Sequence, residues 1–336
     1  MAPPSSETKY FHHGRFRVAG GVLPDAITAY RTYGDPKNPC IVFPTCYGGK
    51  LDSQLYKVGE DKALDPRKYF VVTFALFSNG EPPPYNGPYF PEISYEDNIR
   101  AQHAVLTKEL GVQHVLCAVG FSMGGQQWSF LTLSIRKFLS PQPSFPPNFA
   151  LGLFRFVGQP APALITSEGP KAALLASKDF NDGHYKSTPE LGIRAFARVD
   201  LAFILQWYRQ KKHLHNGTFF DLNSFIREHW ENRFLKNWDA NDMLTLLNTW
   251  QKGDISLIRD RGDFEKALGA IKAKGLVMPG KTDLYFTPED NEYELTHLKN
   301  SKLVVINSVW GHFAGNGANP DDDKFMQAEV KKFLEE

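Results

Sequence analysis

The chain has 336 residues, of which 42% are hydrophobic and 22% charged, and its formal net charge is +1 at pH 7. A balanced charge of this kind provides no basic surface for nucleic acid. No apolar run approaches the roughly 18 residues that a membrane-spanning helix requires. The length favours a core with an inserted subdomain over one compact core.

The three cysteines, Cys40, Cys46 and Cys117, have no metal-ligand spacing. Their odd number fits packed, reduced thiols better than a disulfide framework. The N-terminus lacks the pattern of a signal peptide. We therefore expect a cytoplasmic protein that needs no metal or cofactor, and whose partner is a small molecule rather than a nucleic acid or a membrane.

Short strands dominate the first hundred residues. The polar residues up to about 15 predict a loose arm, and residues 16–18 and 26–33 predict the first two strands. Alternation in the second favours an antiparallel edge strand. Residues 40–43 and 69–74 predict buried strands, and residues 95–110 a helix. Alternating strands and helices indicate a mostly parallel sheet with helices on both faces.

The most informative motif lies at residues 115–125, VLCAVGFSMGG, where a short apolar run ends in Gly-x-Ser-x-Gly and leads into a helical pattern. Gly120 and Gly124 lack the Cβ atoms that would clash in a tight turn, so the turn can expose the Ser122 hydroxyl. The following helix directs its N-terminal N–H groups at the reacting centre. The motif predicts Ser122 as a catalytic nucleophile.

A serine nucleophile needs a base, an orienting acid and an oxyanion hole. Asp283 follows a predicted strand at residues 275–280, and His312 follows another at residues 302–306. The carboxyl ends of parallel strands lie at one edge of a sheet. We therefore expect Asp283 and His312 to converge on Ser122 as a catalytic triad.

Each assignment has an alternative. A glycine-rich turn with an incidental serine explains the motif without catalysis, and Glu289 or Asp290 are the rival acids. Both rivals lie in a segment that has the pattern of a helix start rather than directly after a strand. Most of the other nine histidines lie in helical or loop contexts, which favours His312.

The oxyanion hole is expected to use two main-chain amides, one of them from the residue after the nucleophile, Met123. The other comes from the loop at residues 45–49, TCYGG, which follows an early strand. Cys46 or Tyr47 would donate it, and we assign it to Cys46. A plain glycine turn is the alternative reading of this loop.

Helical, aromatic-rich patterns replace the strands between about residues 161 and 263. We expect a core formed by residues 16–160 and 264–336, with residues 161–263 inserted as a helical lid over the site. Helices that merely pad the core are the alternative. Prolines between Pro141 and Pro147 forbid a helix there and indicate a loop or insertion. The lid aromatics expected to shape the pocket are Phe196, Phe203, Trp207 and Tyr208.

Several short segments spread along nearly the whole chain form a recognisable set: AYRTYG (29–34), LDPRKYFVV (64–72), GPYFP (87–91), DNIRAQ (97–102), SMGG (122–125), EGP (168–170), DAND (239–242), TDLYF (282–286) and GH (311–312). Together they resemble the homoserine O-acetyltransferase-like branch of the α/β-hydrolase superfamily. The resemblance implies the α/β-hydrolase fold, with Ser122 as nucleophile, His312 as base and Asp283 as its orienting acid. It is also compatible with a homodimer.

The chain departs from the acetyltransferases directly after the predicted catalytic histidine. That family usually has an aspartate there, which holds the amino group of homoserine, whereas this chain has Phe313. A phenyl ring cannot pair with an ammonium as a carboxylate does. The Tyr47-Gly48-Gly49 loop combined with WGHFAG at residues 310–315 looks more like relatives described as α/β-fold hydrolases. We expect Tyr47 and Phe313 to contact the substrate.

The sequence thus favours a serine hydrolase that cleaves an ester, thioester or related small acyl substrate through an acyl-serine intermediate. One alternative is an O-acyltransferase that moves an acetyl group from acetyl-CoA to a small alcohol other than homoserine. Another is a non-catalytic protein that uses a lidded cavity to bind a ligand. A complete Ser–His–Asp set argues against the last of these.

Overall fold

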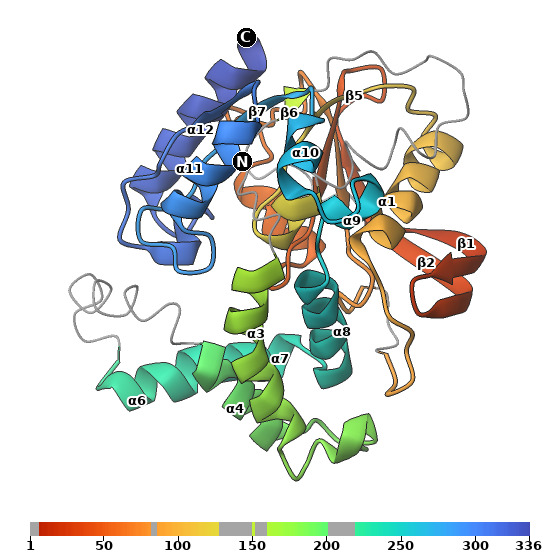
Figure 1. Cartoon of the computed structure of the whole chain (residues 1–336), viewed down its shortest axis with the longest axis vertical. Helices are drawn as coiled ribbons and strands as arrows, with labels where there is room; N and C mark the ends of the chain where they lie inside the picture. Colours follow the sequence, from red (N-terminus) through yellow and green to blue (C-terminus); the bar gives the residue numbers. More distant parts are fainter. Residues whose placement is uncertain (1–6, 82–85, 128–149, 152–159, 201–218) are drawn as a thin grey trace.

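The computed structural model describes residues 7–81, 86–127, 150–151, 160–200 and 219–336. In this part of the chain, strands form a sheet in the order β1-β2-β4-β3-β5-β6-β7-β8 (Figure 1). The pairs β1–β2 and β2–β4 are antiparallel, and the other pairs are parallel. The strands are β1 (Lys9–Val18), β2 (Gly21–Tyr33), β3 (Cys40–Pro44), β4 (Phe70–Phe74), β5 (Val115–Ala118), β6 (Ala150–Leu151), β7 (Lys274–Val277) and β8 (Ser301–Leu303).

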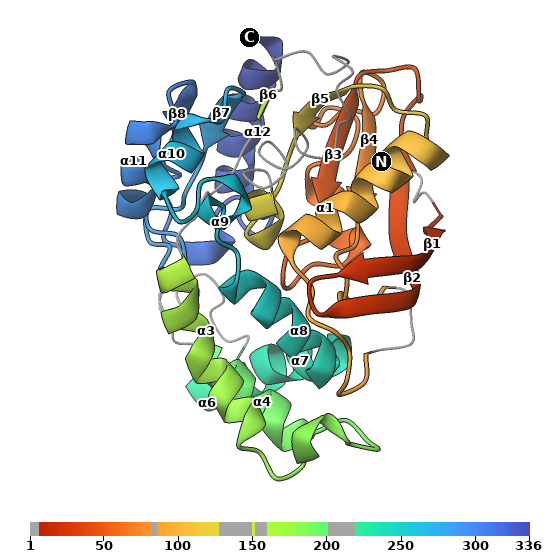
Figure 2. The same ribbon diagram turned by 45° about the vertical axis from the view of Figure 1, so that its right-hand side comes forward.

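Helices cover both faces of this sheet. Helices α1 and α12 lie on opposite faces in both ribbon views (Figures 1 and 2). Every residue of β3 and β4 is buried, as expected of central strands that read as apolar runs rather than as alternating patterns. The longer helices are α1 (Tyr95–Ala104), α3 (Pro160–Leu175), α4 (Glu190–Asp200), α8 (Ala240–Gln251), α11 (Pro288–His297) and α12 (Pro320–Glu335).

The remaining helical elements are short turns and connectors. The α-helical ones are α6 (Leu222–Ser224), α7 (Asn232–Asn237), α9 (Ser256–Arg259) and α10 (Phe264–Gly269). The π-helical turns are η2 (Val105–Glu109) and η5 (Phe225–Glu231), and the 3₁₀ turns are η1 (Leu51–Tyr56), η3 (Asn181–Gly183) and η6 (Gly311–Phe313).

The predicted loose arm is wrong from Lys9 onward, because β1 begins there and pairs with β2 from Lys9↔Tyr30 to Val18↔Gly21. Half of the residues of β1 are exposed and only Val18 is buried, so its polar residues mark an outer strand held mainly by main-chain pairing. Because β1 pairs with β2, the prediction that β2 is an edge strand is also wrong. It lies between β1 and β4, and β1 occupies the edge.

The other predicted elements of the core are confirmed, with small shifts at their ends. Helix α1 begins at Tyr95 because Ser94 and Asp97 form a reciprocal capping box, and its last turn is continued by η2. Strands β7 and β8 end about three residues earlier than predicted. A parallel bridge between Gly280 and Ile306 still holds the two loops that follow them together.

Helices rather than strands occupy the described residues between β6 and β7. We call residues 160–200 and 219–263 the helical segment. Its helices α3, α4, α7 and α8 gather at one end of the sheet (Figures 1 and 2), and α3 packs against α4 and α8. The proline-rich segment from Pro141 to Pro147 and three expected lid aromatics (Phe203, Trp207 and Tyr208) lie outside the described residues.

A buried charged group joins the helical segment to the core loops. The Asp242 carboxylate, near the start of α8, is 2% exposed and accepts the Asn86 N–H at 3.2 Å. The Lys50 ammonium also attracts it, and that ammonium lies 4.7 Å from the centre of the Trp238 ring. Burial, reinforced by the nearby Asp239 charge, raises the pKa of the Asp242 carboxyl from 3.8 to about 7.

This raised pKa predicts a pH-dependent loss of stability. Between about pH 4 and 7 the folded protein keeps a proton on Asp242 that the unfolded chain has released, so this group destabilises the fold as the pH rises. We expect urea unfolding to show a smaller decrease in the free energy of unfolding from pH 5 to pH 8 in Asp242→Asn than in the wild type. Equal decreases in both proteins would contradict the assignment.

Candidate active site

Ser122 lies in a strand-to-helix turn directly after β5. Its φ of 54° is in the left-handed region, which residues other than glycine rarely adopt. The main-chain oxygen of Ser122 accepts the N–H groups of Gly125 and Gln126 at 2.8 and 3.1 Å, which starts the helix at residues 123–127. A strained residue held in this way is typical of functional turns.

Two glycines make this turn sterically feasible. A Cβ atom on Gly120 would lie 2.2 Å from the Gly124 oxygen, and one on Gly124 would lie 2.8 Å from the Pro44 oxygen. Real Cβ atoms do not approach other heavy atoms so closely. The Gly-x-Ser-x-Gly spacing is therefore required by the packing of the turn on itself and on the end of β3.

The structure brings Ser122, His312 and Asp283 together. The Ser122 Oγ lies 3.1 Å from His312 Nε2, and His312 Nδ1 lies 3.1 Å from an Asp283 carboxylate oxygen. All three residues are at least nine-tenths buried. Since a carboxylate can only accept hydrogen bonds, the Nδ1 atom of His312 carries the proton. Its Nε2 atom is then left to accept a hydrogen bond from the serine hydroxyl.

The loop after β7 fixes the Asp283 carboxylate, which also accepts the N–H groups of Tyr285 and Phe286 at 2.8 and 3.2 Å. Aromatic rings surround the imidazole that it orients. The ring centres of Tyr285, Phe121 and Phe286 lie 4.7, 5.2 and 5.4 Å from that of His312. These rings limit the access of water and restrict the orientation of the imidazole.

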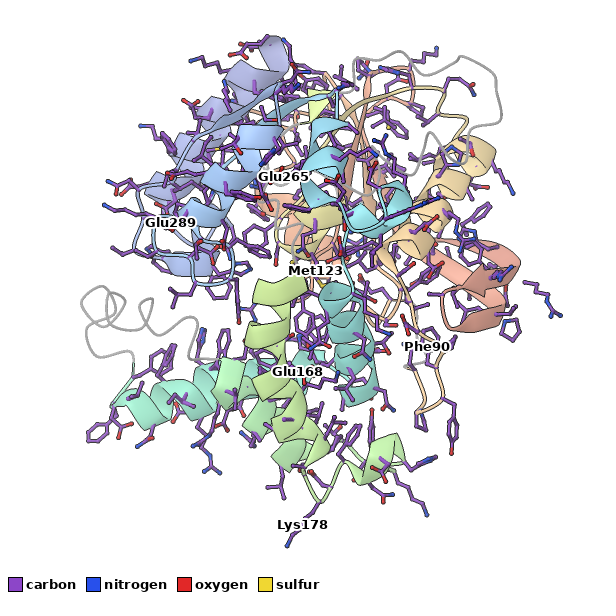
Figure 3. All side chains as sticks on the ribbon, viewed as in Figure 1. Phe90, Met123, Glu168, Lys178, Glu265 and Glu289 are labelled. Atoms are coloured by element: carbon purple, nitrogen blue, oxygen red, sulfur yellow. The ribbon has the colours of Figure 1, made fainter. Side chains whose placement is uncertain are left out.

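The rival acids do not pair with His312. Glu289 is exposed on α11, at the outer surface in Figure 3, and Asp290 belongs to the first turn of that helix.

The predicted oxyanion loop contacts the nucleophile turn directly. A Cβ atom on Gly124 would lie 3.0 Å from the Thr45 oxygen, so the two stretches of main chain touch. In the sequence, Cys46 follows Thr45 and Met123 precedes Gly124. Burial raises the pKa of the Cys46 thiol to about 11, so this thiol is protonated at neutral pH and does not compete with Ser122 as a nucleophile.

A cavity of about 220 Å³ contains Ser122 and His312 on its wall. This volume is below the ~300 Å³ at which pockets for drug-sized ligands begin, which favours a small substrate. Cys46, Tyr47 and Phe313 line it, whereas Met123 is fully buried and is not among the lining residues. Half of the phenylalanine, tyrosine and tryptophan residues on the cavity wall come from the helical segment, namely Phe196, Trp230, Phe234, Trp238 and Trp250.

Tyr47 connects the oxyanion loop to the helical segment. Its ring is nearly parallel to those of Phe196 and Trp238, with centres 6.3 and 6.0 Å away. Its hydroxyl donates to the main-chain oxygen of Met243 in α8 at 3.3 Å. The loop that carries Cys46 is thus held in place by contacts with the helical segment.

Sequence reasoning missed two charged residues of the cavity wall, Asp200 and Arg233. Burial raises the pKa of the Asp200 carboxyl to about 6, and a hydrogen bond from the Tyr285 hydroxyl and the charge of Arg233 oppose that rise. Burial also lowers the pKa of Arg233. A lone aspartate in the mostly apolar stretch at residues 195–204, AFARVDLAFI, is the sequence feature that could have indicated Asp200 as a candidate site residue.

The part of the chain that the structure describes has no group of three or more His, Cys, Asp or Glu side chains placed to hold a metal ion. None of its helices combines the length and apolar character needed to cross a bilayer.

The chain is similar to known esterases and acetyltransferases over most of its length. It is 29% identical to the ethyl acetate hydrolase of Pseudomonas veronii, covering 94% of this chain and 91% of that protein. It is 24% identical to the homoserine O-acetyltransferase of Chlorobium chlorochromatii, covering 88% of this chain and 87% of that one. No family model matches the chain.

Among solved structures, an acetylester hydrolase from Corynebacterium glutamicum superposes with a TM-score of 0.87 at 25% identity, over 98% of this chain and 96% of that one. This likeness confirms the α/β-hydrolase fold that the sequence predicted.

The contact between the nucleophile turn and the oxyanion loop predicts the effect of Gly124→Ala. The added methyl group must push the main chain of Pro44 and Thr45 away, so we expect a loss of about 1–3 kcal/mol in the free energy of unfolding together with a lower kcat. Gly269→Ala is the control, because its methyl group meets no atom within 4 Å. If both variants were as stable and active as the wild type, the contact would not constrain the site.

Proposed function

Because the chain belongs to the homoserine O-acetyltransferase-like branch of the α/β-hydrolase superfamily, we propose that it is a serine esterase of small acyl esters. The observation that carries this proposal is the pair of 3.1 Å contacts that links Ser122, His312 and Asp283 inside a small cavity. The ethyl acetate hydrolase and the acetylester hydrolase among its relatives favour acetyl esters as the substrate class.

In the proposed mechanism, His312 Nε2 takes the hydroxyl proton as Ser122 Oγ attacks the ester carbonyl carbon. The negative charge that develops on the carbonyl oxygen is held by the N–H groups of Cys46 and Met123. The protonated imidazole, oriented by Asp283, then gives its proton to the departing alcohol. A water molecule, deprotonated by His312 in turn, attacks the acyl-serine and releases the acid.

The helical segment acts as a lid in this proposal. It supplies half of the aromatic wall of the cavity, including Phe196 and Trp230. The rings of Phe196 in α4 and of Trp238, directly after α7, stack near Tyr47 of the oxyanion loop. An aromatic roof excludes bulk water and leaves room for a short acyl chain. The lid boundaries at residues 161 and 263, the cytoplasmic location and the homodimer stay predictions.

The second candidate is an O-acyltransferase, because relatives named homoserine O-acetyltransferase match most of the chain. It would share the acyl-serine intermediate and differ only in passing the acyl group to an alcohol instead of water. Phe313 lines the cavity next to His312 where that family has a carboxylate. The wall therefore lacks the carboxylate with which that family holds homoserine at this position, which favours hydrolysis.

Replacing the nucleophile tests the proposal directly. We expect the wild type to release acetate from p-nitrophenyl acetate at a rate that small alcohols, including homoserine, do not change. Ser122→Ala should lose at least about 10³-fold in kcat, because it removes the oxygen that lies 3.1 Å from His312 Nε2 and attacks the ester in the proposed mechanism. A serine-directed phosphonate should label the wild type only.

The outcomes separate the candidates. Acetylated alcohol formed at the expense of acetate would identify a transferase. Full activity in a correctly folded Ser122→Ala variant, checked by circular dichroism, would exclude Ser122 as the nucleophile. Absence of both turnover and labelling in the wild type would leave a binding protein.

A further inference from the structure

A carboxylate that is not part of the triad lines the proposed active-site cavity. Asp200 is the last residue of α4 and lines the same cavity as Ser122 and His312. The Tyr285 hydroxyl donates a hydrogen bond of 2.5 Å to one of its oxygens. The Tyr285 ring in turn packs edge-on against His312, with ring centres 4.7 Å apart. The carboxylate is therefore held next to the reacting centre.

Burying a carboxylate among aromatic rings is costly unless hydrogen-bond donors surround it. Within the described residues, Tyr285 is the one side chain that donates to Asp200. Arg233 attracts the carboxylate from the same wall, but the ion pairs of the described residues do not include one between them. A carboxylate has about four acceptor sites, so Asp200 can accept further donors from a molecule in the cavity.

The charges on this wall restrict what such a donor can be. The positive charge of Arg233, close enough to lower the pKa of Asp200, opposes the entry of an ammonium group. The negative charge of Asp200 likewise opposes a carboxylate approaching Arg233. A neutral group with an O–H donor meets neither repulsion. The aromatic remainder of the wall suits the hydrocarbon part of such a molecule.

On the basis of the proposed esterase function, we propose that Asp200 is a specificity-determining residue that accepts a hydrogen bond from a hydroxyl group of the substrate. The preferred substrates are then short esters that carry a free hydroxyl, such as monoesters of a diol or esters of a hydroxy acid. Tyr285 orients the carboxylate for this contact.

Matched substrate pairs that exchange a hydroxyl for a methyl group test this proposal. One pair places the hydroxyl on the alcohol side, 2-hydroxyethyl acetate against propyl acetate, and the other on the acyl side, ethyl hydroxyacetate against ethyl propionate. The measured quantity is the ratio of kcat/KM within each pair. We expect the wild type to prefer the hydroxylated ester of at least one pair by about tenfold or more, as for a hydrogen bond to a charged group.

Three variants test whether the Asp200 carboxylate causes the preference for hydroxylated esters. Asp200→Leu should abolish or reverse the ratio, and Asp200→Asn should reduce it, because a neutral amide oxygen is a weaker acceptor. Tyr285→Phe keeps the carboxylate but removes the hydrogen bond that orients it, so the hydroxylated ester should stay preferred, by a smaller ratio than in the wild type, even if both rates decrease. General damage to the site would lower both rates of a pair equally and leave the ratio unchanged.

The results distinguish failure of this inference from failure of the proposed function. A wild type that hydrolyses p-nitrophenyl acetate but shows no preference in either pair overturns the hydroxyl subsite and leaves the esterase standing. An unchanged ratio in Asp200→Leu, or in Asp200→Asn if the leucine variant does not fold, also overturns it. A wild type without esterase activity overturns the proposed function, and with it the hydroxyl subsite that rests on that function.

Discussion

The steric contact between two turns of main chain is the constraint on which the site depends. The turn that carries Ser122 folds on itself at Gly120 and presses on the end of β3 at Gly124, with no space for a side chain at either glycine. This contact holds Ser122 in its left-handed conformation and sets the nucleophile beside the loop of Cys46. The strand order then brings the loops after β7 and β8, with Asp283 and His312, to the same edge.

The helical segment is joined to this framework at several chemically different points. Aromatic stacking holds Tyr47 of the oxyanion loop, a hydrogen bond joins Asp200 to Tyr285 beside the imidazole, and Asp242 meets the Asn86 main chain. The first two contacts end at the proposed site, at Tyr47 of the oxyanion loop and at Tyr285 beside the His312 ring. The cavity walls and the reacting groups are therefore parts of one packed unit rather than a core with a separate cover.

The sequence predicted those parts of the site that local patterns determine. Ser122, Asp283 and His312 each follow a short apolar strand, and the shared edge of parallel strands brings such positions together. The sequence predicted only the last three residues of β1, at 16–18, because the earlier part of this outer strand is mostly polar and is held by main-chain pairing to β2. It also missed Asp200, because a helix pattern shows which residues are apolar and not which cavity the end of the helix reaches.

The aromatic wall also gives the molecule an optical property. Trp230, Trp238 and Trp250 line the cavity, and they are half of the six tryptophan residues in the chain. Indole emission depends on the polarity around the ring, and water that enters or leaves this cavity changes that polarity for three rings at once. Occupancy of the cavity is therefore reported by the intrinsic fluorescence of the protein, whether or not the occupant is chemically transformed.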